Sequence, residues 1–495
     1  MGTKFLSKSR FMSGQQCELK LWYDAYRRDL ATPPSEQQQA LFDTGHAVGH
    51  RAQQRWPGGV EVGFKPWERD PAVAQTRKLM ADPTVPAIYE AAFLHQGLYV
   101  RVDILARTDE GWDLVEVKSS TRPEKEVFLK DLAVQYWVLS RLSVPLREVG
   151  ILVLNNQYVY PGGDYDPQEL FRFHEATEYC QEHSDWVGQD VQRLHAVLAR
   201  SEPPVIGVGD HCFRPYECPY FAHCSAGLVE LEHPISDLYR LSQRRREELL
   251  ANGVETIPDI LADFPLSEIQ IRIREAVRSG QPWHSPELEN TLTQVQWPLY
   301  FLDFEAFQPA LPRFIGTRPY QAIAFQFSLH TQQGPGEALA HHEYLHTDSS
   351  DPRPELIRHL LEAVGDTGSI VVYSGYERRM LNELAGACPA QAGELRAVAE
   401  RLWDLLPVIQ NHYYHPEFRG SFSIKAVLPA LVPEEGWSTL EVTDGMSAVL
   451  MYEQALNTDD ECARNRPFDA LRAYCRQDTL AMVRVREALL ETASR

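Results

Sequence analysis

The pattern of apolar and polar residues predicts a strand hairpin in the first part of the chain, helices in the middle part and further strands in the last part. GLYVRVDILARTDEGWDLVEVKSS alternates on both sides of an Asp-Glu-Gly turn and predicts a hairpin with strands near 97–106 and 112–118. PLYFLDFEAF, QAIAFQFSLH and SIVVYSG predict further strands, and a long helix ends the chain. The interval before PLYFLDFEAF is charged and helical in pattern. The sequence therefore predicts an α/β protein in three parts, 1–225, 226–292 and 293–495.

Composition and charge narrow the class of protein. With 495 residues the chain is too long for one hydrophobic core. Because no apolar run approaches the roughly 18 residues of a membrane helix, we expect no membrane contact. The first residues lack the apolar core of a secretory signal, so we expect a cytoplasmic location. The net charge of −21 argues against indiscriminate duplex binding through a broad basic surface, but it is compatible with metal-binding carboxylates beside a local basic groove.

The predicted hairpin carries a candidate metal site. Glu116 and Lys118 share one strand face because the strand period is two, and Asp103 on the neighbouring strand can reach the same place. Two carboxylates suit Mg²⁺ or Mn²⁺, which activates water for phosphodiester hydrolysis, while the lysine supports the developing charge. A solvent-facing Glu–Lys pair is the alternative interpretation.

These residues resemble the PD-(D/E)xK nuclease motif, with Val102 before Asp103 in place of proline. The following helix, KDLAVQYWVL, places Gln135 and Tyr136 where RecB-type members carry a glutamine motif, and the opening SKSRFMSGQQCELKLWY resembles the start of the same group. The resemblance implies a restriction-endonuclease-like fold for residues 1–225, with Asp103, Glu116, Lys118 and Gln135 in its active site.

The segment GHAVGH departs from the RecB-like pattern. Gly49 stands where the group carries a metal-binding histidine, and His46 and His50 flank that position. Either histidine can substitute, or the ligand is missing, and the sequence does not decide between them.

Four cysteines form a second pattern. Cys212, Cys218 and Cys224 are spaced six residues apart, and Cys17 lies far upstream. Because a cytoplasmic chain is not expected to form disulfides, we interpret them as a Cys₄ site that joins the two ends of the first part. Zinc is a competing occupant, although its sites usually pair cysteines two to four residues apart. Unligated thiols are a third interpretation. The other cysteines are expected to be small buried hydrophobes: Cys180, Cys388, Cys462 and Cys475.

The arrangement of one cysteine before the nuclease core and three after it resembles the iron–sulfur RecB-like nucleases, including AddB-type helicase–nuclease subunits and CRISPR-associated exonucleases. That resemblance implies a 4Fe–4S cluster on Cys17, Cys212, Cys218 and Cys224.

The third part offers another candidate metal site. Asp303 and Glu305 lie two apart in an apolar strand, and burying both is costly unless a cation compensates. Tyr474 and Asp478 lie four apart and share a helix face. The set resembles the tyrosine subclass of DEDD exonucleases with an RNase H-like fold. The resemblance implies two metal ions, a Tyr474 that orients water, and 3′–5′ polarity.

The second motif of that family is altered here. Tyr376–Glu377 stands where the family has an aspartate after an aromatic residue, and Asp404 is expected to be structural. FLDFEAF, PYQAIAFQFSLH and AYCRQDT also resemble a prokaryotic domain of unknown function that is often fused behind an iron–sulfur RecB-like half.

In the middle part, ELLANGVETIPDILADFP predicts a helix, a turn at Asn252–Gly253 and a second helix. It is either a helix-hairpin-helix whose turn amides hold a DNA phosphate or a plain linker.

Together these patterns predict a metal-dependent nuclease with two sites, acting on DNA single strands or ends, the second site being a 3′–5′ exonuclease. An RNA-processing exonuclease would use the same acids. A different alternative is a nucleic-acid-binding scaffold whose sites have lost their activity. The departures from the family motifs at Gly49 and Glu377 favour it. The simplest alternative is a globular protein that carries an incidental Cys₄ zinc site. The sequence names no pathway and no helicase, repair or defence partner.

Overall fold

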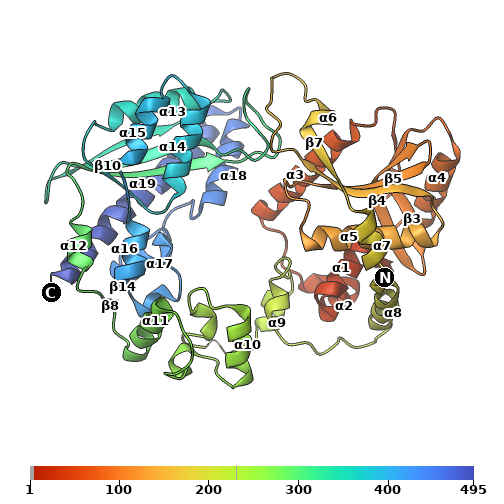
Figure 1. Ribbon diagram of the computed structural model, residues 1–495, viewed down its shortest axis with the longest axis horizontal. Helices are drawn as coiled ribbons and strands as arrows, with labels where there is room; N and C mark the ends of the chain where they lie inside the picture. The colour runs from red at the N-terminus through yellow and green to blue at the C-terminus, as the bar shows by residue number, and fades with distance from the viewer. Residues whose placement is uncertain (1–4, 230, 495) are drawn as a thin grey trace. The chain divides into compact units, whose positions relative to one another are not determined.

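The computed structural model describes residues 5–229 and 231–494. The chain forms two compact units: unit 1 comprises Met1–Leu228 with Pro309–Gln321, and unit 2 comprises Val229–Gln308 with Ala322–Arg495. The short segment Pro309–Gln321 is therefore part of unit 1, although strands of unit 2 precede and follow it. Both units combine helices with β-sheets, which confirms the predicted α/β class (Figure 1). None of the helices in the described part of the chain combines the length and apolarity needed to cross a membrane.

Unit 1 is built on a seven-stranded sheet in the order β2-β3-β4-β5-β6-β7, with β1 paired to β4. The predicted hairpin is present, because β4 pairs antiparallel with β5. The next neighbour, β6, pairs with β5 in parallel. The strands are β1 (Leu6–Ser7), β2 (Val60–Glu61), β3 (Ala87–His95), β4 (Leu98–Thr108), β5 (Gly111–Lys118), β6 (Leu146–Leu154) and β7 (Phe171–Glu175).

Helices cover both faces of this sheet, and the strand period assigns each side chain to a face. Leu114 packs into the larger core with helix α5, whereas Val115 packs into a second core with α3. Glu116 and Lys118 therefore share the α5 face with Leu114, as the sequence predicted. The helices of unit 1 are α1 (Lys8–Gln16), α2 (Glu18–Tyr26), α3 (Glu36–Gln53), α4 (Arg69–Ala81), α5 (Glu126–Arg141), α6 (Pro167–Leu170), α7 (Thr177–His183), α8 (Trp186–Leu198) and α9 (Phe221–Ser225).

Unit 2 contains a five-stranded sheet in the order β11-β10-β9-β12-β13. Its central strand β9 is antiparallel to β10 and parallel to β12. Tyr300, Leu302 and Phe304 of β9 pack against helices α13, α14 and α15. The alternate positions of β9 therefore lie on the face toward the long helix α19. The elements of the sheet layers are β9 (Leu299–Phe307), β10 (Ile323–Gln332), β11 (Leu339–Leu345), β12 (Ser369–Val372), β13 (Leu402–Asp404), α13 (Arg353–Ala363), α14 (Tyr376–Ala387), α15 (Ala392–Glu400) and α19 (Glu461–Ala493).

Smaller elements complete unit 2. A two-stranded sheet pairs β8 with β14. These elements are α10 (Gln243–Ala251), α11 (Glu268–Ser279), β8 (Trp283–His284), α12 (Leu288–Leu292), α16 (Leu405–His412), β14 (Tyr413–Tyr414), α17 (Ile424–Leu431) and α18 (Gly445–Leu456).

The Asn252–Gly253 turn follows α10. The amides of Asn252, Gly253 and Val254 donate to carbonyls of that helix, and Gly253 adopts a φ of +74° to close it. A short 3₁₀ turn, Ile257–Asp259, follows in place of the second helix, and the next helix begins at Glu268. Because the turn amides already have helix partners, the plain-linker interpretation fits this geometry better than a phosphate-binding turn.

Candidate functional site

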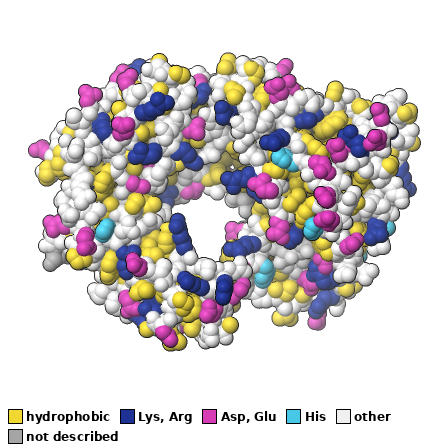
Figure 2. Space-filling view, in the orientation of Figure 1, with side chains coloured by type: hydrophobic (Ala, Val, Ile, Leu, Met, Phe, Trp, Pro, Cys, Tyr) yellow, Lys and Arg dark blue, Asp and Glu magenta, His cyan; other side chains and the backbone are white. Residues whose placement is uncertain are grey.

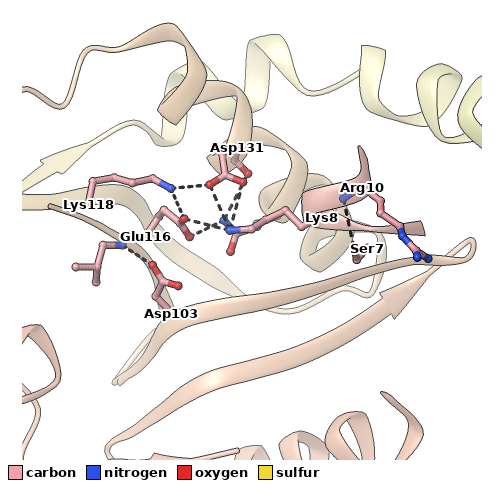
Figure 3. Close-up of polar contacts among 9 residues, drawn as sticks. Ser7, Lys8, Arg10, Asp103, Glu116, Lys118 and Asp131 are labelled. Atoms are coloured by element: carbon pink, nitrogen blue, oxygen red, sulfur yellow. Dashed lines mark hydrogen bonds and ion pairs between the residues drawn. The ribbon is translucent and has the colours of Figure 1, made fainter. Parts of the chain in front are cut away.

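The first candidate site lies where strands β4 and β5 diverge (Figure 3). Their paired register runs from Thr108↔Gly111 to Ile104↔Val115. Just beyond it, a carboxylate oxygen of Asp103 accepts a hydrogen bond from the Val117 amide at 2.8 Å. This side-chain hydrogen bond takes the place of a backbone hydrogen bond between the two strands. It holds the Asp103 carboxylate beside Glu116. The side chain of Glu116 is only 3% exposed.

Helix α5 lies over this strand end and supplies two polar side chains one turn apart. Gln135 donates to Glu116 Oε2 at 2.7 Å. Lys118 Nζ lies 2.6 Å from Glu116 Oε1 and 2.7 Å from Asp131 Oδ2. The structure therefore brings together all four predicted residues, Asp103, Glu116, Lys118 and Gln135. Tyr136 packs against the apolar core instead.

Sequence reasoning missed two members of this group. Lys8 Nζ reaches Glu116 Oε1 at 3.1 Å and Asp131 at 3.3 Å. Asp131 precedes Gln135 by one helical turn, a spacing that could have identified it from the predicted helix. Lys8 is 108 residues from Glu116, so no local pattern links them. We call Lys8, Asp103, Glu116, Lys118, Asp131 and Gln135 the hairpin site.

Burial and charge act together in the hairpin site. Burial and the neighbouring Glu116 raise the pKa of Asp103 to about 8. Burial opposes ionisation of Glu116, but Lys118 and Lys8 outweigh it and hold the pKa of Glu116 below its usual range. Burial likewise opposes charging of both lysines, yet Glu116 and Asp131 outweigh it and raise their pKa values. Carboxylate oxygens are hard ligands, so the acids of this site fit Mg²⁺ or Mn²⁺.

The two histidines near the altered motif are on α3. His46 and His50 are both exposed. At Gly49 an added Cβ would have no atom within 4 Å, so the position where the RecB-like group carries its histidine opens onto free space. Among the described residues, no hydrogen bond or ion pair joins His46 or His50 to the hairpin site, and whether either is a metal ligand stays open.

The four predicted cysteines gather at one end of unit 1. Cys17 separates α1 from α2, and Cys224 lies in α9. The Cys218 amide donates to the Cys212 carbonyl at 2.7 Å, and both side chains are buried around Tyr220. Burial raises the pKa of the Cys218 and Cys224 thiols, and the nearby thiols of Cys17 and Cys212 raise it further. The fold thus brings residue 17 next to the loop 212–224.

The spacing of these thiols bears on what they can hold. Tetrahedral zinc with Zn–S bonds of about 2.3 Å needs sulfur atoms roughly 3.8 Å apart. Within residues 5–229 and 231–494, the four thiols do not form a group of donors closer than 4.8 Å to one another. An iron–sulfur cluster differs from zinc in that each thiolate ligates a separate iron atom, so both occupants stay open here.

The second candidate site surrounds β9 in unit 2. Asp303 and Glu305 lie on the face toward α19, opposite Ser328 and Gln326 of β10. Donor atoms of Asp303, Glu305 and Cys475 lie within 4.8 Å of one another. The Cys475 thiol donates to Asp303 Oδ2 at 3.9 Å. Cys475 is therefore part of a polar site rather than only a buried hydrophobe, and Cys462 is exposed.

Helix α19 also brings Tyr474 and Asp478 to this site. Trp437 Nε1 donates to Asp478 Oδ1 at 2.8 Å. Lys425 Nζ, from α17, donates to the Tyr474 hydroxyl at 3.0 Å. Sequence reasoning missed both residues. Trp437 lies in no recognisable motif, and Lys425 lies in SFSIKAVLPAL, which resembles the family's sequence between its second and third motifs but gave no role for the lysine.

Glu377 enters from the first turn of α14, directly after β12. Ser374 in the connecting turn has a φ of +140°, a conformation that costs energy for a residue with a side chain. Glu377 is 3% exposed and interacts with Asp303, while its Oε2 atom has no hydrogen-bond partner among the described residues. Asp404, in contrast, caps α16 by accepting from the Leu406 amide, a structural role.

The acids around β9 are protonated more easily than usual. Burial, and then repulsion by the neighbouring acids, raise the pKa values of Asp303 and Glu305 well above their ordinary range. Burial also raises the pKa of Glu377 to about 7 and that of Asp478 to about 6. A group of buried, mutually repelling carboxylates with an orphaned oxygen fits divalent cations. We call Asp303, Glu305, Glu377, Tyr474 and Asp478 the β9 site.

Comparison with known protein families matched one part of the chain. Residues 300–423 match a domain of unknown function (DUF2779). The match includes Asp303, Glu305 and Glu377 but ends before the α19 residues Tyr474 and Asp478. No curated protein matched the chain.

Proposed function

We propose that the protein is a metal-dependent nuclease that hydrolyses phosphodiester bonds of DNA, in single strands or at ends, using two separate sites. The observation that carries the proposal is the β9 site. Its carboxylates come from a central strand, a helix start and a long helix, and they face one another in a buried setting. Such a set is costly to fold unless cations bind there.

In the β9 site, Asp303, Glu305, Glu377 and Asp478 would hold the metal ions. Bound Mg²⁺ or Mn²⁺ would supply water activation and neutralise charge on the phosphate. Tyr474, whose hydroxyl accepts a hydrogen bond from Lys425, would orient the attacking water. Degradation from the 3′ end, and an RNase H-like fold for residues 293–495, come from the resemblance to DEDD exonucleases.

In the hairpin site, Asp103 and Glu116 would hold Mg²⁺ or Mn²⁺, and Gln135 orients Glu116 through its 2.7 Å hydrogen bond. Lys118 provides a charged donor next to the reacting water or phosphate. The hairpin geometry supports a PD-(D/E)xK nuclease in residues 1–225. A 4Fe–4S cluster on Cys17, Cys212, Cys218 and Cys224 would tie the two ends of that part together.

The charge distribution is compatible with a nucleic-acid substrate bound locally. On the face shown in Figure 2, basic and acidic side chains of the described residues are interspersed rather than gathered into one basic field. DNA binding would therefore rest on short clusters and on the metal ions, as the net charge of −21 also indicates.

The test is digestion of end-labelled oligonucleotides by the full-length protein, purified without oxygen. Single-stranded DNA should be shortened in Mg²⁺ or Mn²⁺ and protected by EDTA, and an RNA competitor of the same sequence should protect it less than DNA does. Asp303→Asn should slow the 3′–5′ reaction by orders of magnitude, since it removes a metal ligand. Asp366→Asn, an exposed acid, is the control and should change nothing. Protein that binds DNA but releases no product would favour the scaffold interpretation.

A further inference from the structure

The first helix of the chain delivers a second lysine to the hairpin site. Strand β1 pairs with β4 at Ser7↔Tyr99. The Ser7 hydroxyl then accepts a hydrogen bond from the Arg10 amide at 3.3 Å, which caps α1. Lys8 is therefore the first residue of the helix, and its side chain points toward Glu116 and Asp131 (Figure 3).

Lys8 and Lys118 share the same two acidic partners. Lys118 Nζ lies 2.6 Å from Glu116 Oε1, and Lys8 Nζ lies 3.1 Å from that same oxygen. Both ammonium groups also contact Asp131, at 2.7 Å and 3.3 Å. The two lysine side chains are only 21% and 19% exposed, so solvent screens these pairs weakly. Two ammonium groups thus balance the charge of two carboxylates.

This balance has a consequence for metal binding. Lys8 contacts one of the two Glu116 oxygens available to a divalent ion, so the ion and this ammonium would compete for the carboxylate. Repulsion between a divalent ion and a neighbouring ammonium would be substantial even at an effective dielectric of roughly 20. A phosphodiester arriving with the ion would offer Lys8 a new negative partner.

We propose that Lys8 is a positioning residue that sets the metal affinity of the hairpin site: its ammonium competes with the divalent ion for Glu116 and yields when the nucleic acid arrives. The inference rests on the proposed nuclease function of this site. With Lys8 in this role, the hairpin site binds metal weakly without substrate and more tightly with it. By thermodynamic linkage, the metal and the nucleic acid tighten each other's binding by the same factor.

The experiment is a Mn²⁺ titration of the full-length protein, followed by the resonance of free Mn²⁺, in a background of Asp303→Asn and Glu305→Gln that weakens the β9 site. Lys8→Met should bind Mn²⁺ at least about tenfold more tightly than the background protein. Lys8→Arg keeps the charge and should bind like the background. Lys130→Met, an exposed lysine of α5 paired with Glu126, is the control and should also bind like the background.

A non-cleavable phosphorothioate oligonucleotide supplies the second measurement. It should tighten Mn²⁺ binding in the background protein and tighten it much less in Lys8→Met. Unchanged or weaker Mn²⁺ binding by Lys8→Met, or tighter binding by Lys8→Arg, would overturn the role of Lys8. Glu116→Gln separates the two claims: if it still binds Mn²⁺ at the hairpin site as before, the proposed function of that site fails as well. If it loses Mn²⁺ while Lys8→Met shows no gain, only the inference about Lys8 fails.

Discussion

Glu377 is the member of the β9 site that most needs a test, because it stands where the resembled motif has an aspartate. Its carboxylate is buried, interacts with Asp303 and keeps one oxygen without a hydrogen-bond partner among the described residues. A glutamate reaches about one carbon–carbon bond further than an aspartate. Glu377 starts from the first turn of α14, three residues after the strained Ser374.

Glu377→Gln tests this role. If Glu377 ligates metal, the variant should lose 3′–5′ activity as severely as Asp303→Asn, and Glu377→Asp should retain part of it. Tyr474→Phe should cost less than either, because it removes only a water-orienting hydroxyl. Full activity of Glu377→Gln in a digestion of 5′-labelled DNA would remove the residue from the site.

A second residue-scale feature is a pair of histidines beside the β9 site. His330 Nδ1 bonds Thr479 at 2.8 Å, and His341 Nε2 bonds Ser328 at 2.9 Å. Burial, with contributions from Arg476, lowers the pKa of each imidazole to about 4. Both rings are therefore neutral in the folded protein at pH 7.

This pair predicts a loss of stability in acid. A group whose folded pKa is lowered from 6.5 to about 4 contributes full stability above pH 6.5 and loses it as the pH falls toward 4. At pH 5 the loss for His330 is on the order of 1 to 2 kcal/mol. The urea midpoint of His330→Asn should therefore fall less between pH 7.5 and pH 5 than that of the unmodified protein. Equal falls would show that His330 is not held neutral.

At the scale of elements, the cysteine cluster connects α1 and α2 to the loop that ends in α9. Tyr220 donates to Asp24 at 2.7 Å and packs among the cysteines, so the apolar and polar contacts there depend on the same geometry. A cluster bound at this place would hold the N-terminal helices, and hence Lys8, against the sheet.

Replacing one ligand tests the cluster. Anaerobically purified protein should contain iron and absorb near about 400 nm, as thiolate-ligated iron clusters do. Cys212→Ser should lose both the iron and the absorption and should lower the melting temperature. Cys462→Ser removes an exposed cysteine and should leave both unchanged. Stoichiometric zinc without iron would contradict the cluster and support the competing metal.

The elements also show how far the sequence predicts the sites. The strand period alone placed Glu116 with Lys118 and Asp303 with Glu305, because alternation is a local property of the chain. Lys8, Lys425 and Trp437 could not be predicted, since tertiary packing brings them in from distant segments. Cys475 is buried, as predicted, but its polar neighbour Asp303 could not be predicted because it comes from a distant strand.

At the scale of the whole molecule, the chain does not divide at simple boundaries. Residues 309–321 leave the sheet of unit 2 and join unit 1, where Ala310 enters the core beside α3. The Tyr320 hydroxyl donates to the Ser119 carbonyl at 2.6 Å, directly after Lys118. No sequence pattern indicated this exchange, because the segment reads as an ordinary turn between two strands. A fragment ending near residue 228 would lack these contacts, so the sites are best compared in the intact chain.

The most direct test of two independent nuclease sites is a comparison of four full-length proteins: unmodified, Asp303→Asn, Lys118→Met and the double variant. Each digests the same DNA, labelled once at the 5′ end and once at the 3′ end, in Mn²⁺. We expect Asp303→Asn to abolish the 3′–5′ ladder and Lys118→Met to remove a separate set of products, with the double variant inactive, because the two sites share no residues and belong to separate units. If either single variant silences all cleavage, or if the double variant still cuts, the two-site account is contradicted.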